Sequence, residues 1–393
     1  MLQSIHPFPA RMAPDLALNS LQALKSGTVL DPMTGSGTVA RVAKGRSLNA
    51  LGFDLDPLAV LISKVGTTAV DDELVDQQCQ IFMSAARSLS DSDVQLNWID
   101  GDADAERYVE FWFGDAQRPD LRKIAYLLSK ADELQIDPNI ADVLRIALSR
   151  IIVTKKSAAS LAQDTSHSRP HRVATESSYD VLMGFEKSVR AVRRRLAGMP
   201  STGNVTIRHG DARDLSAVAD ESVDAVLTSP PYLNAIDYMR GHRMSLIWLG
   251  HGYSALSRTR SNSIGSERKP DSPFEGDHHS VMKSAMGELS GLQKRQHSMI
   301  ERYVMDMYKM TSEVARTLKP KCTATFVMGN SCLNGDYIEN SEALAKAGEL
   351  LGLGEPVKQE RDLPSGSRYL PTPDAGALSK RMRNEVILTF TKQ

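Results

Sequence analysis

The sequence predicts an α/β protein with a mostly parallel sheet that is interrupted by a helical insertion. Three observations carry this prediction: strand and helix patterns alternate near the N-terminus, a long middle stretch is mostly helical in pattern, and strand patterns return in the C-terminal half. With 393 residues the chain exceeds one average domain, so two units or one domain with large insertions are expected.

Residues 1–70 are predicted to form the first part of the core. The apolar run 28–31 ends in a loop with two glycines, and apolar residues follow at helical spacing from Val39, which indicates strand, loop and helix. A second strand is predicted at 50–54, and Pro57 marks the start of a helix. Together these elements make one βαβ unit of a Rossmann-like sheet, in which ligands bind at the carboxyl ends of the strands.

Residues 71–200 are predicted to form a mostly helical insertion, because apolar residues recur at helical spacing along most of it. Within it, 165–178 is polar and is interpreted as a loop or an arm. Between Arg150 and Arg208, eleven basic residues stand against four acidic ones, a net charge of +7 in a chain whose formal charge is -1. A local contact with a polyanion would have this appearance, and a solvated helix face is the alternative.

Residues 201–393 are predicted to complete the core. A polar stretch at about 254–294, rich in Ser, Gly, Arg, Lys and His, is interpreted as a flexible insertion. The other expected elements are strands at 205–208, 223–227, 324–328 and 385–390, an amphipathic helix through Met299, Tyr303, Met307 and Val314, and a helix near 341–351.

The composition excludes several classes of protein. A hydrophobic fraction of 41% and a charged fraction of 24% are ordinary for a globular protein and exclude global disorder. The N-terminus lacks the features of a signal peptide and no run approaches a membrane span, so the cytoplasm is the expected location. No metal site is expected: Pro170 interrupts the histidine pair His167 and His171, and the three cysteines match neither zinc nor disulfide spacing.

The first candidate site is the glycine loop 31–38. Its two glycines allow backbone to approach a ligand closely, and it faces the N-terminus of a helix. Such a loop can hold a phosphate or an adenosyl group, and a plain structural turn is the alternative. The residues singled out are Asp31, Pro32, Thr34, Gly35, Ser36, Gly37 and Thr38.

Acidic residues at two further strand ends strengthen the prediction of a ligand site. Asp54 ends the second strand and can accept both ribose hydroxyls, with Asp56 as a competing candidate. Asp211 ends a third strand and can take an adenine amino group, with Ala212 packing beside the ring. Taken singly, Asp211 is interpreted more simply as a strand-end cap.

The second candidate site is the tetrapeptide Ser229, Pro230, Pro231 and Tyr232, which follows a predicted strand. The two prolines fix φ and remove two donors, which gives a rigid extended loop. The Ser229 hydroxyl and the Pro230 carbonyl can then accept hydrogen bonds from an exocyclic amino group that attacks an electrophilic methyl group. Tyr232 offers a ring face to a base removed from its stack. A Pro-Pro turn after a buried strand is the structural alternative.

With these two loops, the chain resembles the amino-methyltransferases of DNA, especially those with a Ser-Pro-Pro-Tyr loop that methylate the cytosine amino nitrogen. The resemblance covers roughly 1–70, 204–250 and 315–393 and implies a class I methyltransferase fold with S-adenosylmethionine as cofactor. It further implies that loop 31–38 holds the methionine part of the cofactor, that Asp54 binds its ribose and that Asp211 meets its adenine. The segment from His6 to Met12 resembles the part of this family that flanks the cofactor.

The resemblance implies methylation of cytosine at N4, because a serine at Ser229 favours cytosine over adenine. Adenine N6 in DNA, a base in RNA, and a catalytically silent nucleic-acid-binding module stay open as alternatives. Methylation of a ring carbon is disfavoured, because it needs a Pro-Cys nucleophile and no cysteine here follows a proline. The chain also departs from the family in the order of its loops. Its glycine loop precedes the loop 229–232, called the catalytic loop below, whereas many cytosine-amino enzymes have the opposite order.

The expected partner is duplex DNA with the target base flipped out, and a cognate restriction or defence partner stays open. Guanidinium groups pair bidentately with phosphate oxygens, so arginines of the basic segment are candidates for phosphate contacts. Asn234, Asp237 and Tyr238, just past the catalytic loop, line the base pocket or begin a helix. The arginines selected for phosphate contacts are Arg169, Arg172, Arg190, Arg193 and Arg194.

Overall fold

The computed structural model of this chain contains one seven-stranded sheet, in the order β10-β11-β7-β6-β1-β2-β5. The structure describes residues 3–8, 11–163, 170–198, 202–233, 237–266, 276–333, 335–363 and 384–393. The strands are β1 (Thr28–Asp31), β2 (Asn49–Asp54), β5 (Val205–His209), β6 (Val223–Thr228), β7 (Leu318–Met328), β10 (Val357–Asp362) and β11 (Asn384–Thr391).

The sheet is mostly parallel, which confirms the predicted α/β class. The pairs β1 with β2, β1 with β6, β2 with β5 and β6 with β7 are all parallel, and only β11 runs against its two neighbours in this sheet. Every strand predicted from an apolar run is present in the sheet. Strand β10 was missed because its residues are polar and mostly exposed, so pairing with β11 rather than burial makes it a strand.

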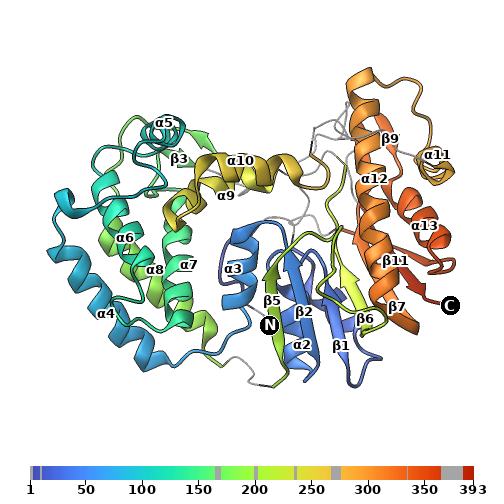
Figure 1. Ribbon diagram of the computed structural model, residues 1–393, viewed down its shortest axis with the longest axis horizontal. Coiled ribbons are helices and arrows are strands. Elements are labelled where there is room, and N and C mark those ends of the chain that lie inside the picture. Colours follow the sequence, from blue (N-terminus) through green and yellow to red (C-terminus); the bar gives the residue numbers. More distant parts are fainter. Residues whose placement is uncertain are drawn as a thin grey trace.

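Helices cover both faces of the sheet (Figure 1). Successive strand residues point to opposite faces, so Leu30 and Val226 pack toward α12 (Lys294–Thr317) and α13 (Asn340–Leu350). Their neighbours Val29 and Ala225 pack toward α1 (Pro14–Ser20) and α2 (Thr38–Gly45) on the other face. Helix α3 (Pro57–Val65) lies against β2 and β5.

Between α3 and β5 the chain builds a lobe of helices, drawn at the left of Figure 1. The rings of Phe82, Phe113, Phe185 and Trp248 are fully buried in the core of this lobe, which α3 also joins through its apolar face. This core is completed by residues that follow β6, Trp248 among them, and it joins the sheet through α3. Its elements are α4 (Asp72–Ser88), the 3-10 turn Asp91–Asp93, α5 (Ala103–Trp112), α6 (Arg118–Ser129), α7 (Pro138–Ile152), β3 (Ala162–Gln163), β4 (His171–Arg172) and α8 (Val181–Leu196).

After β6 the chain forms α9 (Tyr238–Leu246), the 3-10 turn Ile247–Leu249 and α10 (Tyr253–Asn262), and α10 passes across the top of the sheet toward α12 (Figure 1). Helix α11 (Asp277–Ser284) and the hairpin of β8 (Ser331–Leu333) and β9 (Asp336–Ile338) lie beside α12 and α13.

Part of the stretch at about 254–294, where a flexible insertion is expected, is helical. Helices α10 and α11 occupy much of this stretch, and residues 267–275 lie outside the described residues. Few apolar side chains are buried here: Leu256 on α10, Met282 on α11 and Met286 just past α11, whereas Val281 of α11 is exposed. Within the described part of the chain, no helix is long and apolar enough to cross a membrane.

Candidate active site

The glycine loop and the catalytic loop meet at one edge of the sheet. Strand β1 lies between β2 and β6, and all three run in the same direction, so the residues that follow them share the carboxyl edge. The hydroxyl of Thr228, at the end of β6, donates a hydrogen bond of 2.8 Å to Oδ1 of Asp31, at the end of β1. The two loops selected from the sequence are therefore tied together at their roots.

The glycine loop has backbone conformations and packing that demand glycine. Gly35 and Gly37 have φ values of 49° and 76°, in the left-handed region. Gly37 precedes the first residue of α2, and a Cβ there would lie 2.5 Å from Oγ and 2.9 Å from Cα of Ser63 on α3. The loop therefore packs closely against α3. The unpaired amide groups at the start of α2 lie at the same edge of the sheet.

Asp31 is a buried carboxyl group at this edge, with 4% of the residue exposed. Burial raises its pKa to about 7, although hydrogen bonds from Thr228 and from the backbone N–H of Met33 act in the opposite direction. The nearby Asp54 carboxylate raises the pKa of Asp31 further.

Asp54 closes the glycine loop from the neighbouring strand. Its Oδ2 accepts the N–H of Gly35 at 2.8 Å and its Oδ1 accepts the N–H of Asp56 at 3.0 Å. Burial, followed by the charge of Asp56, raises the pKa of Asp54 to about 7. Two carboxyl groups with raised pKa values at one edge favour a ligand that brings positive charge, because such a ligand lowers the free energy of their ionised forms.

Asp56 caps α3 and forms an ion pair with His242 on α9. Its Oδ1 accepts the N–H of Leu58 at 2.9 Å and its Oδ2 contacts Nδ1 of His242, with both residues buried. Burial alone would raise the pKa of Asp56, but the charge and hydrogen bond of His242 outweigh it and hold that pKa below its usual value. With its carboxylate engaged in this way, Asp56 is a structural residue, which favours Asp54 over it as the ligand-facing carboxylate.

Phe8 covers this corner of the site. Its ring stacks on Tyr238, with centroids 5.5 Å apart, and lies 5.4 Å from the ring of His242. A Cβ at Gly35 would lie 3.4 Å from the Phe8 ring, so the N-terminal segment also contacts the glycine loop. The sequence singled out the segment but not His242, whose contact with Asp56 joins residues 186 positions apart.

The catalytic loop is held in place from α12 and β8. Burial raises the pKa of the Tyr232 phenol, and the neighbouring Ser229 hydroxyl partly opposes this effect. The fully buried Tyr303 donates its hydroxyl to the carbonyl of Pro231 at 3.2 Å, and Ser331 donates its hydroxyl to the carbonyl of Leu233. Neither Tyr303 as a loop contact nor Ser331 was found from the sequence, because both act across long chain separations.

Asp211 lies beside the edge, and its carboxylate is occupied by Arg213. Oδ1 accepts both the backbone N–H and Nε of Arg213 at 2.9 Å, and Oδ2 accepts Nη2 at 2.6 Å. Burial opposes ionisation of Asp211, but Arg213 overcomes it and holds the pKa below its usual value. The neighbouring Ala212 is buried against Phe53 and other apolar residues. These contacts fit the interpretation of Asp211 as a strand-end cap, and its role toward adenine stays a prediction.

The described arginines of those selected for phosphate contacts belong to the helical lobe. Arg190 and Arg193 lie on α8; Arg190 is 4.0 Å from Glu186, and Arg193 pairs with two aspartates of α4 at 3.0 and 2.7 Å. Arg194 is exposed on the same helix, and Arg172 stacks over the ring of Phe111. Arg169 lies outside the described residues.

Of the residues just past the catalytic loop, Asn234 lies outside the described residues, Asp237 precedes α9 and accepts a hydrogen bond from Arg260, and Tyr238 begins α9. No cluster of three or more potential metal ligands occurs in the part of the chain that the structure describes.

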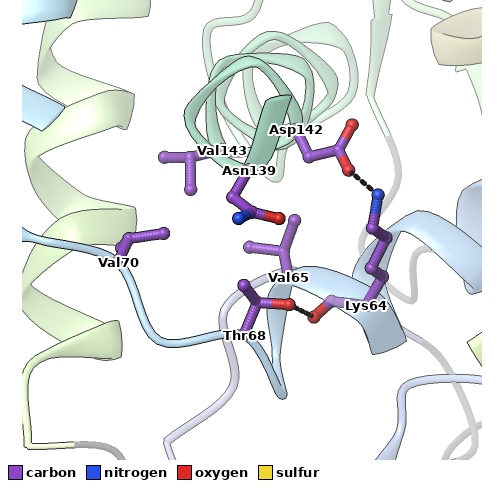
Figure 2. A pocket seen from close by; sticks show the side chains of 7 residues that line it. All are labelled: Lys64, Val65, Thr68, Val70, Asn139, Asp142 and Val143. Atoms are coloured by element: carbon purple, nitrogen blue, oxygen red, sulfur yellow. Dashed lines mark hydrogen bonds and ion pairs between the residues drawn. The ribbon is translucent and has the colours of Figure 1, made fainter. Parts of the chain in front are cut away.

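A narrow recess lies elsewhere, between α3 and α7 (Figure 2). Lys64 and Asp142 form an ion pair of 2.7 Å at its rim. Its lining includes no residue of the glycine loop or of the catalytic loop, and the lining residues are Lys64, Val65, Thr68, Val70, Asn139, Asp142 and Val143.

The sheet defines a Rossmann-like α/β protein with the glycine loop and the loop 229–232 at one edge, and comparisons with known proteins agree with this fold class. No family model matches the chain. The chain is similar to the Type II methyltransferase M.BsoBI of Geobacillus stearothermophilus, with 21% identity over 85% of this chain and 74% of that protein. It is also similar to the Type II methyltransferase M.MvaI of Kocuria varians, with 21% identity over 98% of this chain and 89% of that protein. Both similarities support the expected methyltransferase activity.

Two solved structures resemble the chain more loosely. One is the rRNA methyltransferase aviRa from Streptomyces viridochromogenes, with 11% identity, a TM-score of 0.32 and coverage of 100% of this chain and 89% of that one. The other is a SAM-dependent methyltransferase from Methanosarcina mazei, with 8% identity, a TM-score of 0.34 and coverage of 97% and 98%. The assignment of the fold rests on the sheet itself.

Proposed function

We propose that this chain is a DNA methyltransferase that uses S-adenosylmethionine to methylate an exocyclic amino group of a base. The observation that carries the proposal is the hydrogen bond between Thr228 and Asp31, which joins the root of the glycine loop to the root of the catalytic loop. A methyl donor held by the first loop would therefore lie beside an amino group held by the second. The similarity to two Type II methyltransferases supports the same activity.

The residues at the edge fit S-adenosylmethionine. The cofactor supplies a methyl group on a positively charged sulfur, and its amino acid part carries an ammonium group. The buried carboxyl groups of Asp31 and Asp54 favour such a cation. The proposed contacts to the methionine part come from Asp31, Pro32, Thr34, Gly35, Ser36, Gly37 and Thr38.

The proposed contacts to the rest of the cofactor come from two strand ends. Asp54 would receive the ribose hydroxyls, and Asp211 with Ala212 would lie beside the adenine. Asp211 already accepts three hydrogen bonds from Arg213, so its contact with adenine would use a lone pair that remains. The contribution of Asp211 is therefore expected to be smaller than that of Asp54.

The catalytic loop would align the amino group. Ser229 and the carbonyl of Pro230 accept its two N–H groups, Pro231 keeps the loop rigid, and Tyr232 stacks on the flipped base. The nitrogen forms its bond to the methyl carbon as the carbon–sulfur bond breaks, and the nitrogen then releases a proton to solvent. The rate enhancement would come from positioning, without a covalent enzyme intermediate.

The proposed target is N4 of cytosine, because the loop begins with Ser229. N6 of adenine in DNA and a base in RNA are the alternatives that keep the same chemistry. Digestion of the methylated product and identification of the modified nucleoside distinguishes the three. The Type II names of both relatives favour a place in restriction and modification beside a cognate nuclease.

The test is transfer of a labelled methyl group from S-adenosylmethionine to duplex DNA. The purified protein is expected to label the DNA, and the double variant Ser229→Ala, Tyr232→Ala is expected to lose the labelling. The exposed Ser92→Ala in the helical lobe is a matched control that should keep it. Labelling that survives the double change would overturn the role of the loop, and a titration without any cofactor binding would favour the silent module.

A further inference from the structure

We infer that the surface formed by α9 and α10, residues 237–266, holds the phosphates of the duplex whose base enters the active site. This inference rests on the proposed function and adds the surface that binds the nucleic acid. The catalytic loop follows β6 at the carboxyl edge of the sheet, so a duplex that delivers a base to this loop would lie over that edge. Helix α10 crosses there, between the helical lobe and α12 (Figure 1).

The α9–α10 surface carries the charge that phosphates require. Residues 237–266 contain four arginines and one acidic residue, Asp237, which gives a net charge of +3 before histidines are counted. Arg240 keeps 48% of its side chain exposed at 3.9 Å from Asp237, and Arg260 keeps 43% exposed. Arg258 is exposed and forms no ion pair within the described part of the chain.

The outward face of α10 allows a close approach. The exposed residues recur at helical spacing and, apart from Arg258, are small or polar: Ser254, Ala255, Ser261 and Asn262. Its opposite side buries Leu256 in the core of the helical lobe. A phosphate backbone could therefore approach this face without meeting bulky apolar side chains.

Buried charges fix the C-terminal end of α10 beside the catalytic loop. Arg213 donates to the carbonyl of Asn262 at 2.7 Å and Arg302 donates to that of Ser261 at 3.2 Å. Both arginines pair with the buried Asp306 of α12. Just beyond the helix, a Cβ at Gly265 would lie 3.2 Å from the backbone carbonyl oxygen of Tyr232. The α9–α10 surface thus has a fixed position relative to the catalytic loop, which would receive the base.

The basic helix α8, expected from the sequence to contact phosphate, is placed differently. Arg193 is already paired with Asp72 and Asp76. Helix α8 ends at Leu196 and leads to the amino end of β5, whereas the catalytic loop leaves β6 at the carboxyl edge (Figure 1). A duplex engaged with the catalytic loop therefore meets α10 rather than the C-terminal turn of α8.

The test measures the affinity of the full-length protein for a labelled duplex at several salt concentrations. Each lost phosphate contact lowers the slope of log affinity against log salt by about 0.9. Arg240→Ala and Arg258→Ala are each expected to lower it by about one contact and to raise KM for DNA, with kcat at saturating DNA unchanged. Arg258→Lys, which keeps the charge, should retain the slope.

Matched control variants show whether the loss of phosphate contacts is specific to the α9–α10 surface. Arg87→Ala, an exposed arginine on α4, which Figure 1 draws at the lower left, far from α10, should leave the slope unchanged, and so should Arg190→Ala with Arg194→Ala on α8. Suppose that the wild-type protein methylates DNA. If the slope is then unchanged in the α9–α10 variants, or falls in the α8 variants, this inference alone is overturned. A wild-type protein that neither binds nor methylates duplex DNA overturns the proposed function as well.

Discussion

The raised pKa values of Asp31 and Asp54 predict that the affinity for S-adenosylmethionine depends on pH. Burial brings both pKa values from 3.8 to about 7, so below pH 7 the free protein holds protons on these carboxyl groups. A cationic cofactor favours the ionised carboxylates, and binding must therefore release protons. The affinity should increase as pH rises toward 7 and level off above it.

The magnitude follows from the number of carboxylates that must ionise. Each pH unit below 7 weakens the affinity by up to about tenfold for each such carboxylate. Because Asp54 raises the pKa of Asp31, the two titrate as a pair, and the slope should lie between one and two protons.

Isothermal titration calorimetry between about pH 5.5 and about pH 7.5 measures this dependence, below the pH at which an α-amino group loses its charge. Titrations in buffers of different ionisation enthalpy count the released protons. Asp31→Asn should lower the count by about one. An affinity that stays constant over the range, with no proton released, would refute the placement of the cationic cofactor beside Asp31 and Asp54.

Three further predictions concern the residues that hold the two loops. Gly37→Ala forces a Cβ against Ser63 at a positive φ and should lower the free energy of unfolding by about 1–3 kcal/mol in urea titrations, together with cofactor affinity. Gly45→Ala, on the same helix with open space around it, should leave both intact or raise stability slightly. Tyr303→Phe removes the hydrogen bond to the catalytic loop and should lower kcat, with stability changed by about 1 kcal/mol and cofactor affinity unchanged; an unaltered kcat would contradict a positioning role. His242→Ala leaves Asp56 buried without its partner and should destabilise the protein by about 3–5 kcal/mol, an effect that a second change, Asp56→Asn, should partly reverse.

The parts of the fold that the sequence could predict are those with a local pattern. Strands β1 and β2 are short apolar runs that end in turn residues, and both were located within a residue of their observed bounds. Helix α12 carries a regular apolar stripe over its length and was also expected. Strand β10 has no such pattern, and α10 has Leu256 as its one buried residue. Neither element was therefore predicted from the sequence.

In the candidate site, too, the sequence predicts the features that depend on local patterns and misses those that depend on distant contacts. The two loops were found because glycines and prolines restrict the backbone locally, and their meeting followed from the direction of parallel strands. The pair of Asp56 and His242 and the contact of Tyr303 with the catalytic loop join distant segments, and each such side chain is ordinary in its own sequence neighbourhood. The same holds for Arg213, which the sequence gave no reason to place on Asp211.

The insertion of the helical lobe between two neighbouring strands has a consequence for how the chain folds. Strands β2 and β5 pair side by side, yet Ala50 meets Val205 only after the whole lobe has been made. The entropic cost of closing so long a loop exceeds that of a turn of about five residues by about 3 kcal/mol, since each doubling of length adds about 0.6 kcal/mol. Early collapse of α4 to α8 on one another would shorten the effective loop, and Trp248, which follows β6, completes their core later. We therefore expect β5 to dock after this collapse, and the edge of β2 that is unpaired until then to be the point at which a nascent or heated chain aggregates.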